Sequence, residues 1–372
     1  MRKPKNPFLL SGYHSPPYFC DRQQELDWLI DQFDNERNAV IYAYRRMGKT
    51  ALIRHFFYHL QKKKQAQTIF VDLLGTSSMA EAHKKLATAI FSQMGNPGGI
   101  GKKMLSMLSA VGANISMDPV SGAPQVTVGL IQPAALSRSM DAMGDYLKTS
   151  KKPVVIAIDE FQQIVNYQDA NAEAVFRSWT QDFPMIRFVF CGSHRQMMQS
   201  IFSDQNRPFY GSAQLLSLDP IDPSEYKNFI KEFFKKEGLT ITGKMIDLIF
   251  SWARRQTYYV QLLCNKLFAK GHDPDDSLLD EVQQEILQQE SPLFGTYQHL
   301  LTDFQWQVLK AIAQAESVPN PTSREFIDHY YLGAASSVSS ALSTLIKKEF
   351  IVHEGGRYSL HDTLLMRWLQ QL

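Results

Sequence analysis

The feature that most constrains the fold is a short loop at residues 43–50, which reads A-Y-R-R-M-G-K-T. An apolar run at 39–43 predicts a buried strand before the loop, and apolar residues at helical spacing over 48–62 predict a helix after it. The pattern A/G-x-x-x-x-G-K-S/T between a strand and a helix is typical of a phosphate-binding loop. We therefore predict an α/β domain organised around this loop.

The residue types in this loop suit a triphosphate ligand. Backbone N–H groups at the start of a helix, together with the positive end of its dipole, bind phosphate oxygens. Gly48 allows the backbone to approach the phosphate, Lys49 is expected to bridge the β- and γ-phosphates, and the Thr50 hydroxyl is expected to ligate Mg²⁺. Ala43 stands where glycine is usual, so the loop must begin in a conformation that alanine tolerates. A chance match at a strand–turn–helix is the alternative explanation.

Two further apolar runs end in polar residues that this chemistry needs. The run at 154–158 is followed by Asp159 and Glu160. We expect Asp159 to hold the metal ion, usually through water, and Glu160 to polarise the attacking water; the alternative is that Asp159 caps the next helix. The run at 187–191 leads to Ser193, which is either a sensor that contacts the attacking water or the γ-phosphate, or a plain turn residue.

The apolar runs also indicate the class of fold. Five of them are separated by segments with helical spacing, and they lie at 39–43, 68–73, 153–159, 186–191 and 214–218. Their hydrophobicity is continuous rather than alternating, which is typical of strands buried on both faces of a parallel sheet. We therefore predict a doubly wound parallel-sheet α/β domain over residues 18–220, after an extended, proline-rich lead-in at 1–17.

Two local features are predicted within this domain. Residues 95–130 interrupt the strand–helix pattern, and we expect a glycine-rich hinge, a short helix and an inserted hairpin there. Near the start of the domain, apolar spacing predicts a helix over 21–35 with Asp21 as its N-cap.

Two smaller domains are predicted after residue 220. Residues 221–292 have almost entirely helical spacing, and we interpret them as a helical lid. Residues 293–372 are expected to form a second domain of helices near 303–315, 322–330 and 334–348, followed by strands at 350–353 and 357–360. Three helices followed by a hairpin are the plan of a winged-helix domain.

Charge gives little support to a nucleic-acid partner. The chain has 39 basic and 37 acidic residues, so it carries no global basic field. Between residues 301 and 372, six basic residues oppose seven acidic ones, and the expected recognition helix at 334–348 is rich in serine. DNA affinity comes largely from the neutralisation of phosphates. DNA binding and protein docking by the winged helix therefore both stay open.

Composition limits the cellular setting. The three cysteines are far apart and offer neither a disulfide framework nor a zinc site. The densest apolar runs are about five residues long, far short of a membrane span, and no secretory leader pattern follows the basic N-terminus. We expect a cytoplasmic protein with no membrane partner, and we leave self-association open. His55 and His59 have a spacing that could bind metal, but no third ligand is evident, and we expect a surface or packed pair.

These motifs resemble those of the archaeal-type ATPases in the STAND branch of the AAA+ P-loop NTPases, especially the versions with a C-terminal winged helix that are common in gut Bacteroidetes. Residues 19–26, F-C-D-R-Q-Q-E-L, are similar to the family's F-x-G-R-x-x-E-L, and residues 44–50 are similar to its P-R-R-x-G-K-T loop. The segments I-D-E-F-Q at 158–162 and C-G-S at 191–193 also look like family segments. The likeness extends from about residue 17 to the end of the chain.

The resemblance implies an ATPase that binds ATP or ADP with Mg²⁺, with the adenine between residues 19–22 and the lid. Taken with the motifs above, the catalytic residues would be Lys49, Glu160 and Ser193, and the metal ligands Thr50 and Asp159. The nucleotide-binding residues would be Phe19, Arg22, Tyr44, Arg45, Arg46, Met47, Gly48, Lys49, Thr50 and Ala51. Ser212 replaces a family arginine, so the arginine that stabilises transition-state charge is left to be chosen among Arg45, Arg46, Arg195, Arg207, Arg254 and Arg255.

Two hypotheses about function follow. In the first, the chain is an ATP-hydrolysing switch, slow or activated by a partner, in which nucleotide state sets the orientation of the lid and the winged helix. In the second, it is a DNA-binding winged-helix regulator in which the bound nucleotide is mainly structural. The intact set of Lys49, Thr50, Asp159 and Glu160 favours the first hypothesis.

Overall fold

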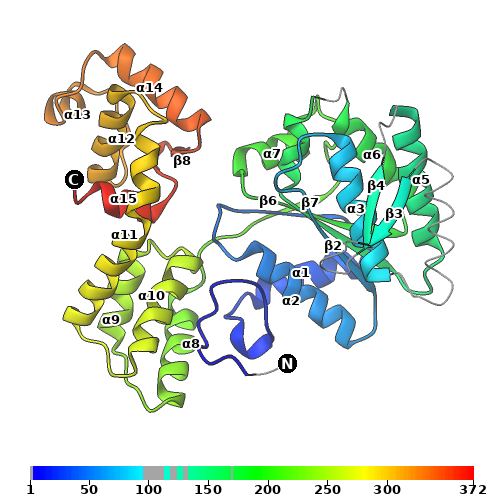
Figure 1. Ribbon diagram of the computed structural model, residues 1–372, viewed down its shortest axis with the longest axis horizontal. Helices are drawn as coiled ribbons and strands as arrows, with labels where there is room; N and C mark the ends of the chain where they lie inside the picture. Colours follow the sequence, from blue (N-terminus) through cyan, green and yellow to red (C-terminus); the bar gives the residue numbers. More distant parts are fainter. Residues whose placement is uncertain (1–2, 95–112, 118–123, 129–132, 169–170) are drawn as a thin grey trace. The chain divides into compact units, whose positions relative to one another are not determined.

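The chain divides into two compact units (Figure 1). The computed structural model describes residues 3–94, 113–117, 124–128, 133–168 and 171–372. Unit one comprises residues 11–226, and unit two combines the N-terminal residues 3–10 with residues 227–372.

A five-stranded parallel sheet forms the centre of unit one and confirms the five predicted strands. The strands are β1 (Ala39–Tyr42), β2 (Gln67–Asp72), β5 (Val154–Asp159), β6 (Ile186–Gly192) and β7 (Gln214–Ser217). Their order across the sheet is β2-β5-β6-β1-β7, and all neighbouring pairs are parallel. Strand β6 therefore lies between β1 and β5, and the carboxyl ends of all three meet at one edge of the sheet.

Helices cover both faces of this sheet (Figure 1). One face is covered by α1 (Gln23–Asp34) and α2 (Lys49–Lys62). The other is covered by α3 (Met79–Met94), α5 (Pro133–Lys148), α6 (Ala172–Asp182), α7 (Arg195–Ser203) and the 3-10 helix η2 (Phe161–Asn166). In β1, Ala39 and Ile41 pack in the core beneath α1 and α2. Val40 and Tyr42 pack in the core on the opposite face of the sheet. Both faces of the strand are buried, which explains why its sequence is continuously apolar.

The inserted hairpin is present. Strands β3 (Ala113–Met117) and β4 (Pro124–Val128) pair in antiparallel fashion, as predicted. The predicted glycine-rich hinge, the short helix after it and the turn of the hairpin lie outside the described residues.

The predicted cap of the first helix is wrong. Helix α1 begins at Gln23, and its N-cap residue is Arg22 rather than Asp21, with no side-chain cap hydrogen bond. Asp21 and Arg22 both have left-handed backbone conformations, with φ of 52° and 69°. Because Cys20 and Arg22 are buried, tertiary packing rather than local capping sets this turn.

Unit two contains the predicted lid helices together with the N-terminal residues. The helices of the predicted lid, which we call the lid helices, are α8 (Pro223–Lys236) from Lys227 onward, α9 (Gly243–Trp252), α10 (Thr257–Lys270) and α11 (Asp276–Gln298). Phe8 is fully buried against the rings of Phe233, Phe234 and Phe268. Asn6 Nδ2 donates to the Asn265 carbonyl at 2.8 Å, and Asn265 Nδ2 donates to the Phe8 carbonyl at 2.7 Å. Residues 3–10 are thus a packed part of the lid.

The predicted winged helix follows α11, which continues through Pro292 to Gln298. It consists of α12 (Asp303–Ala315), α13 (Arg324–His329), α14 (Ala335–Lys347), the antiparallel strands β8 (Ile351–Glu354) and β9 (Arg357–Leu360), and α15 (Thr363–Leu369). The three helices and the hairpin confirm the prediction, whereas the closing helix α15 was not predicted. Among the described helices, none is long and apolar enough to cross a membrane.

Candidate nucleotide site

The phosphate-binding loop joins β1 to α2 in a conformation that leaves the helix start open to a ligand. Gly48 is the N-cap residue of α2, with φ of 88°, and no side chain caps the helix. Arg46 also has a left-handed backbone, with φ of 68°. A left-handed arginine is strained, and such strain is often found at ligand sites. The loop therefore directs the first N–H groups of α2, and the positive end of its dipole, toward a potential anion site.

Lys49 lies inside this loop and is only 6% exposed. Its Nζ donates to the carbonyl oxygens of Ala43 at 2.9 Å and Tyr44 at 2.8 Å. These partners are neutral, so the buried ammonium donates hydrogen bonds to the loop and has no directly bonded counter-ion among the described residues. A phosphate oxygen would be a stronger partner, because charge-assisted hydrogen bonds are about twice as strong as neutral ones.

Thr50 and Asp159 meet at the carboxyl end of the sheet. The Thr50 hydroxyl donates to Asp159 Oδ2 at 2.7 Å. Burial and the charge of Glu160 raise the pKa of Asp159, while hydrogen bonds from Thr50 and Cys191 and the charge of Lys49 oppose the rise. Hydroxyl and carboxylate oxygens are ligands that Mg²⁺ prefers. These two residues fit a magnesium site, and a bound cation would favour the charged form of Asp159.

Glu160 has a left-handed backbone, with φ of 53°, and is the N-cap residue of η2. Its Oε2 accepts hydrogen bonds from the Ser193 hydroxyl at 2.6 Å and from Gln162 Nε2. Asp159 Oδ1 accepts a hydrogen bond from the Glu160 N–H at 3.0 Å, but the N-cap residue of η2 is Glu160 rather than Asp159, and η2 has no side-chain cap bond. Ser193, predicted as a sensor, is here bonded to the predicted general base.

The remaining predicted nucleotide-binding residues belong to the loop itself, to α2 and to the segment before α1. Met47 is buried in the core beneath α1 and α2, so its side chain faces the protein rather than a ligand. The ring of Phe19 stacks on His55 of α2 with centroids 4.3 Å apart. Arg22 is buried and donates from Nη1 to Glu25 at 2.7 Å, while its Nη2 has no hydrogen-bond partner among the described residues. Ala51 lies in the first turn of α2.

The two histidines of α2 form a packed pair, as expected. Their rings meet edge to face with centroids 4.7 Å apart, and Tyr13 Oη bonds to His55 Nδ1 at 2.8 Å. Burial, with a smaller contribution from His59, lowers the pKa of His55 to about 4. Within the described part of the chain, no group of His, Cys, Asp and Glu side chains is arranged to hold a metal ion by itself.

Comparison with known families fits this geometry. A family model described as an ATPase domain predominantly from Archaea matches residues 19–261, more than half of the chain. The chain belongs to this archaeal-type ATPase family. A second model, described as a probable winged helix domain, matches residues 292–371. No curated protein matches the sequence.

Solved structures resemble this archaeal-type ATPase along almost its whole length. The Walker-type ATPase PABY2304 of Pyrococcus abyssi superposes with a TM-score of 0.67 at 16% identity, covering 98% of this chain and 99% of that one. The ORC2 protein of Aeropyrum pernix, solved as ADPNP-ADP complexes, gives a TM-score of 0.61 at 14% identity, covering 99% and 96%. The ORC1 protein of the same organism, in complex with DNA, gives 0.53 at 14% identity, also covering 99% and 96%. At these identities the likeness shows the fold alone.

The structure separates the arginine candidates of the archaeal-type ATPase. Arg207 forms an ion pair with Glu173 of α6 and donates to Ser200 at 3.0 Å, so it is committed to packing. Arg195, at the start of α7, lies over the ring of Tyr44 in the phosphate-binding loop, 5.2 Å from its centroid, and donates to Ser217 at 2.8 Å. Among these two, Arg195 is the one placed beside the loop.

Two polar residues of the site were not singled out from the sequence. Gln162 bonds to Glu160 and Ser193, and the thiol of the fully buried Cys191 bonds to Asp159. Both residues lie inside the segments 158–162 and 191–193 that carry the family resemblance. Their presence in those segments was the available signal, because neither residue type by itself indicates catalytic chemistry.

Proposed function

We propose that this protein binds ATP with Mg²⁺ and hydrolyses it, and that the nucleotide state sets the orientation of the lid and the winged helix. The observation that carries the proposal is the 2.7 Å hydrogen bond between Thr50 and Asp159, which joins the phosphate-binding loop to the end of β5. Two motifs that are 109 residues apart in sequence meet there with the chemistry of one Mg–triphosphate site.

Each side chain of the site has a defined task in this proposal. Thr50 and Asp159 would hold Mg²⁺, which neutralises phosphate charge when it is bound. Lys49 would exchange its two carbonyl partners for phosphate oxygens. Glu160 would orient the attacking water and accept its proton, and Arg195, which lies over the ring of Tyr44, would act on developing charge.

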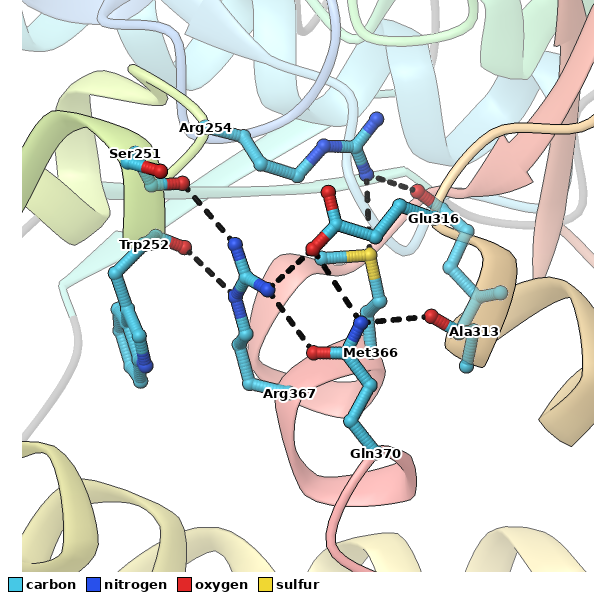
Figure 2. A network of polar contacts seen from close by, with 9 residues as sticks. Ser251, Trp252, Arg254, Ala313, Glu316, Met366, Arg367 and Gln370 are labelled. Carbon is cyan, nitrogen blue, oxygen red and sulfur yellow. Dashed lines mark hydrogen bonds and ion pairs between the residues drawn. The ribbon is translucent and has the colours of Figure 1, made fainter.

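The contacts within unit two support the coupling of the lid to the winged helix. Figure 2 shows Arg367 of α15 donating to the Trp252 and Ser251 carbonyls at the end of α9, each at 3.1 Å, and to Glu316 at 2.6 Å. Arg254, just after α9, donates to the Leu360 carbonyl at the end of β9 at 3.1 Å. Because these bonds fix the end of α9 to α15, the lid helices and the winged helix are expected to move together.

The side chains of the winged-helix domain give little support to the DNA-binding alternative. Of its six basic residues, Lys348 donates to the Leu300 carbonyl at 2.6 Å, Arg357 donates to Ser317 at 2.7 Å, and Arg367 is held in the junction just described. The exposed positions of α14 are mainly serines. A salt titration against duplex DNA tests this alternative, since phosphate contacts would weaken steeply with salt.

Glu160→Gln tests the proposed function. The wild-type chain should turn over ATP in the presence of Mg²⁺, whereas the variant should bind ATP with similar affinity and hydrolyse it at least about 100-fold more slowly, because a general base contributes at least that much. Steady-state phosphate release and equilibrium nucleotide binding, measured on the same preparations, check both parts. Equal turnover in the two proteins would remove Glu160 from this role.

A further inference from the structure

A buried amide lies against the predicted general base. Gln162 is only 5% exposed, and its neighbours Phe161 and Ile164 belong to the hydrophobic core. Its Nε2 donates to Glu160 Oε2 and lies 3.3 Å from the Ser193 hydroxyl, which itself donates to Glu160 Oε2 at 2.6 Å. Burying an amide in an apolar core is unfavourable unless its hydrogen bonds are made. The three side chains therefore form a closed cluster around one carboxylate oxygen.

The backbone of β6 makes room for this amide at Gly192. A Cβ atom added there would lie 2.4 Å from Gln162 Oε1 and 2.4 Å from Met198 Sδ, closer than such contacts ever come. A larger residue at this position would therefore displace the Gln162 amide or the Met198 side chain from the positions that they occupy here. The glycine of the C-G-S segment and the glutamine of the I-D-E-F-Q segment are two parts of one packing arrangement.

The orientation of the amide is set by charge. Gln162 Oε1 is buried and has no hydrogen-bond partner among the described residues. A flipped amide would be less favourable, because its oxygen rather than its NH₂ group would then face the Glu160 carboxylate. Leaving a buried acceptor unpaired costs free energy, and the chain tolerates this cost at the position where the donor contacts Glu160.

We propose that Gln162 is a positioning residue for Glu160, which it holds together with Ser193 in the orientation needed to accept a proton from the attacking water. Both bonds go to Oε2, so neither uses Oε1, the oxygen that this arrangement leaves for the water. The left-handed backbone of Glu160 also limits the directions in which its side chain can point. This inference rests on the proposed ATP hydrolysis and adds a residue to its site.

The test compares Gln162→Met with Gln163→Met. Methionine has about the length and volume of glutamine but cannot donate, and Gln163 is a half-buried neighbour of the same type, so it serves as the matched control. We expect Gln162→Met to lower the rate of ATP hydrolysis about 10- to 100-fold while the Kd for ATP stays within about twofold. Its thermal midpoint should not fall, because the substitution also removes an unpaired buried acceptor. Gln162→Glu should lower the rate further, since it places a second carboxylate beside Glu160.

Two results would overturn the proposal: turnover by Gln162→Met within twofold of wild type, or a slower rate accompanied by a matching loss of ATP affinity or thermal stability. If the wild-type chain itself shows no turnover, the proposed hydrolysis fails, and crystal structures of the wild type and Gln162→Met decide the positioning role separately. The Glu160 carboxylate should then occupy a different rotamer in the variant, and an unchanged rotamer would refute the role.

Discussion

Two polar clusters of the molecule use their hydrogen bonds differently. The loop end of unit one comprises Lys49, Thr50, Asp159, Glu160, Gln162 and Ser193. The lid–winged-helix junction of unit two is the set of contacts that Arg367 makes with α9 and Glu316. In the junction, all three guanidinium nitrogens of Arg367 are bonded to protein atoms. At the loop end, Lys49 is held by two neutral carbonyls, while Gln162 keeps one buried polar atom without a hydrogen-bond partner among the described residues. A cluster that keeps bonding capacity is suited to a ligand, and one that uses all of it is suited to holding domains together.

The largest effect is expected at the loop. Lys49→Ala should lower ATP affinity about 1000-fold, or about 4 kcal/mol, because it removes the cation from the triphosphate site. Stability should change little, since Lys49 donates only to two loop carbonyls. Calorimetric titration with Mg–ATP checks the affinity, and Lys62→Ala, at the opposite end of the same helix, is the control. Tight binding by Lys49→Ala would show that the loop does not bind triphosphate.

The junction should respond in the opposite way. Arg367→Ala should cost about 2 kcal/mol of unfolding free energy, because it removes the ion-pair partner of Glu316 and the donor to the Ser251 and Trp252 carbonyls. ATP affinity should stay unchanged. Urea unfolding measures the stability, and Arg324→Ala is the matched control, because its ion pair with Asp328 is exposed and should contribute less than about 0.5 kcal/mol. A large loss of ATP affinity without a loss of stability would contradict the division between the two clusters.

The smallest effect is expected in how the unfolding free energy depends on pH, through the Glu316 carboxyl of the junction. Burial raises the pKa of Glu316, but the hydrogen bond and charge of Arg367, with Gln370 and Arg254, together lower it below the usual 4.5. A carboxyl whose pKa is lower in the folded chain stabilises the fold above the unfolded value and loses this contribution as pH falls through the folded value. Glu316→Gln should therefore make the unfolding free energy fall less steeply as pH drops below the usual glutamate value of 4.5. Parallel curves for the variant and the wild type would contradict it.

Periodicity predicted most of the fold because local patterns determine single elements. The five strands, the lid helices, and the three helices and hairpin of the winged helix all lie where the apolar spacing placed them. The strand order was not predicted, because it depends on how helices cross the sheet rather than on the strands themselves. Helix α15 was not predicted because it is only seven residues long and most of its side chains are buried in the domain core.

The candidate site shows the same limit. Lys49, Thr50, Asp159 and Glu160 stand in motifs whose residue types already indicate phosphate and metal chemistry, and the structure places Thr50 against Asp159 as the motifs require. The position of Gln162 depends on contact between η2 and the end of β6, which are about 30 residues apart. No local pattern encodes such a contact.

The packing of Phe8 has a consequence for synthesis on the ribosome. Its partners on α8 and α10 extend to Phe268, so this N-terminal side chain is made about 260 residues before the last ring that covers it. At roughly 5–20 residues per second, the nascent chain must carry an unburied phenylalanine for about 13 to 52 seconds. During that interval residues 3–10 are free to meet chaperones, and the helices that pack on Phe8 cover it only after most of the polypeptide has emerged.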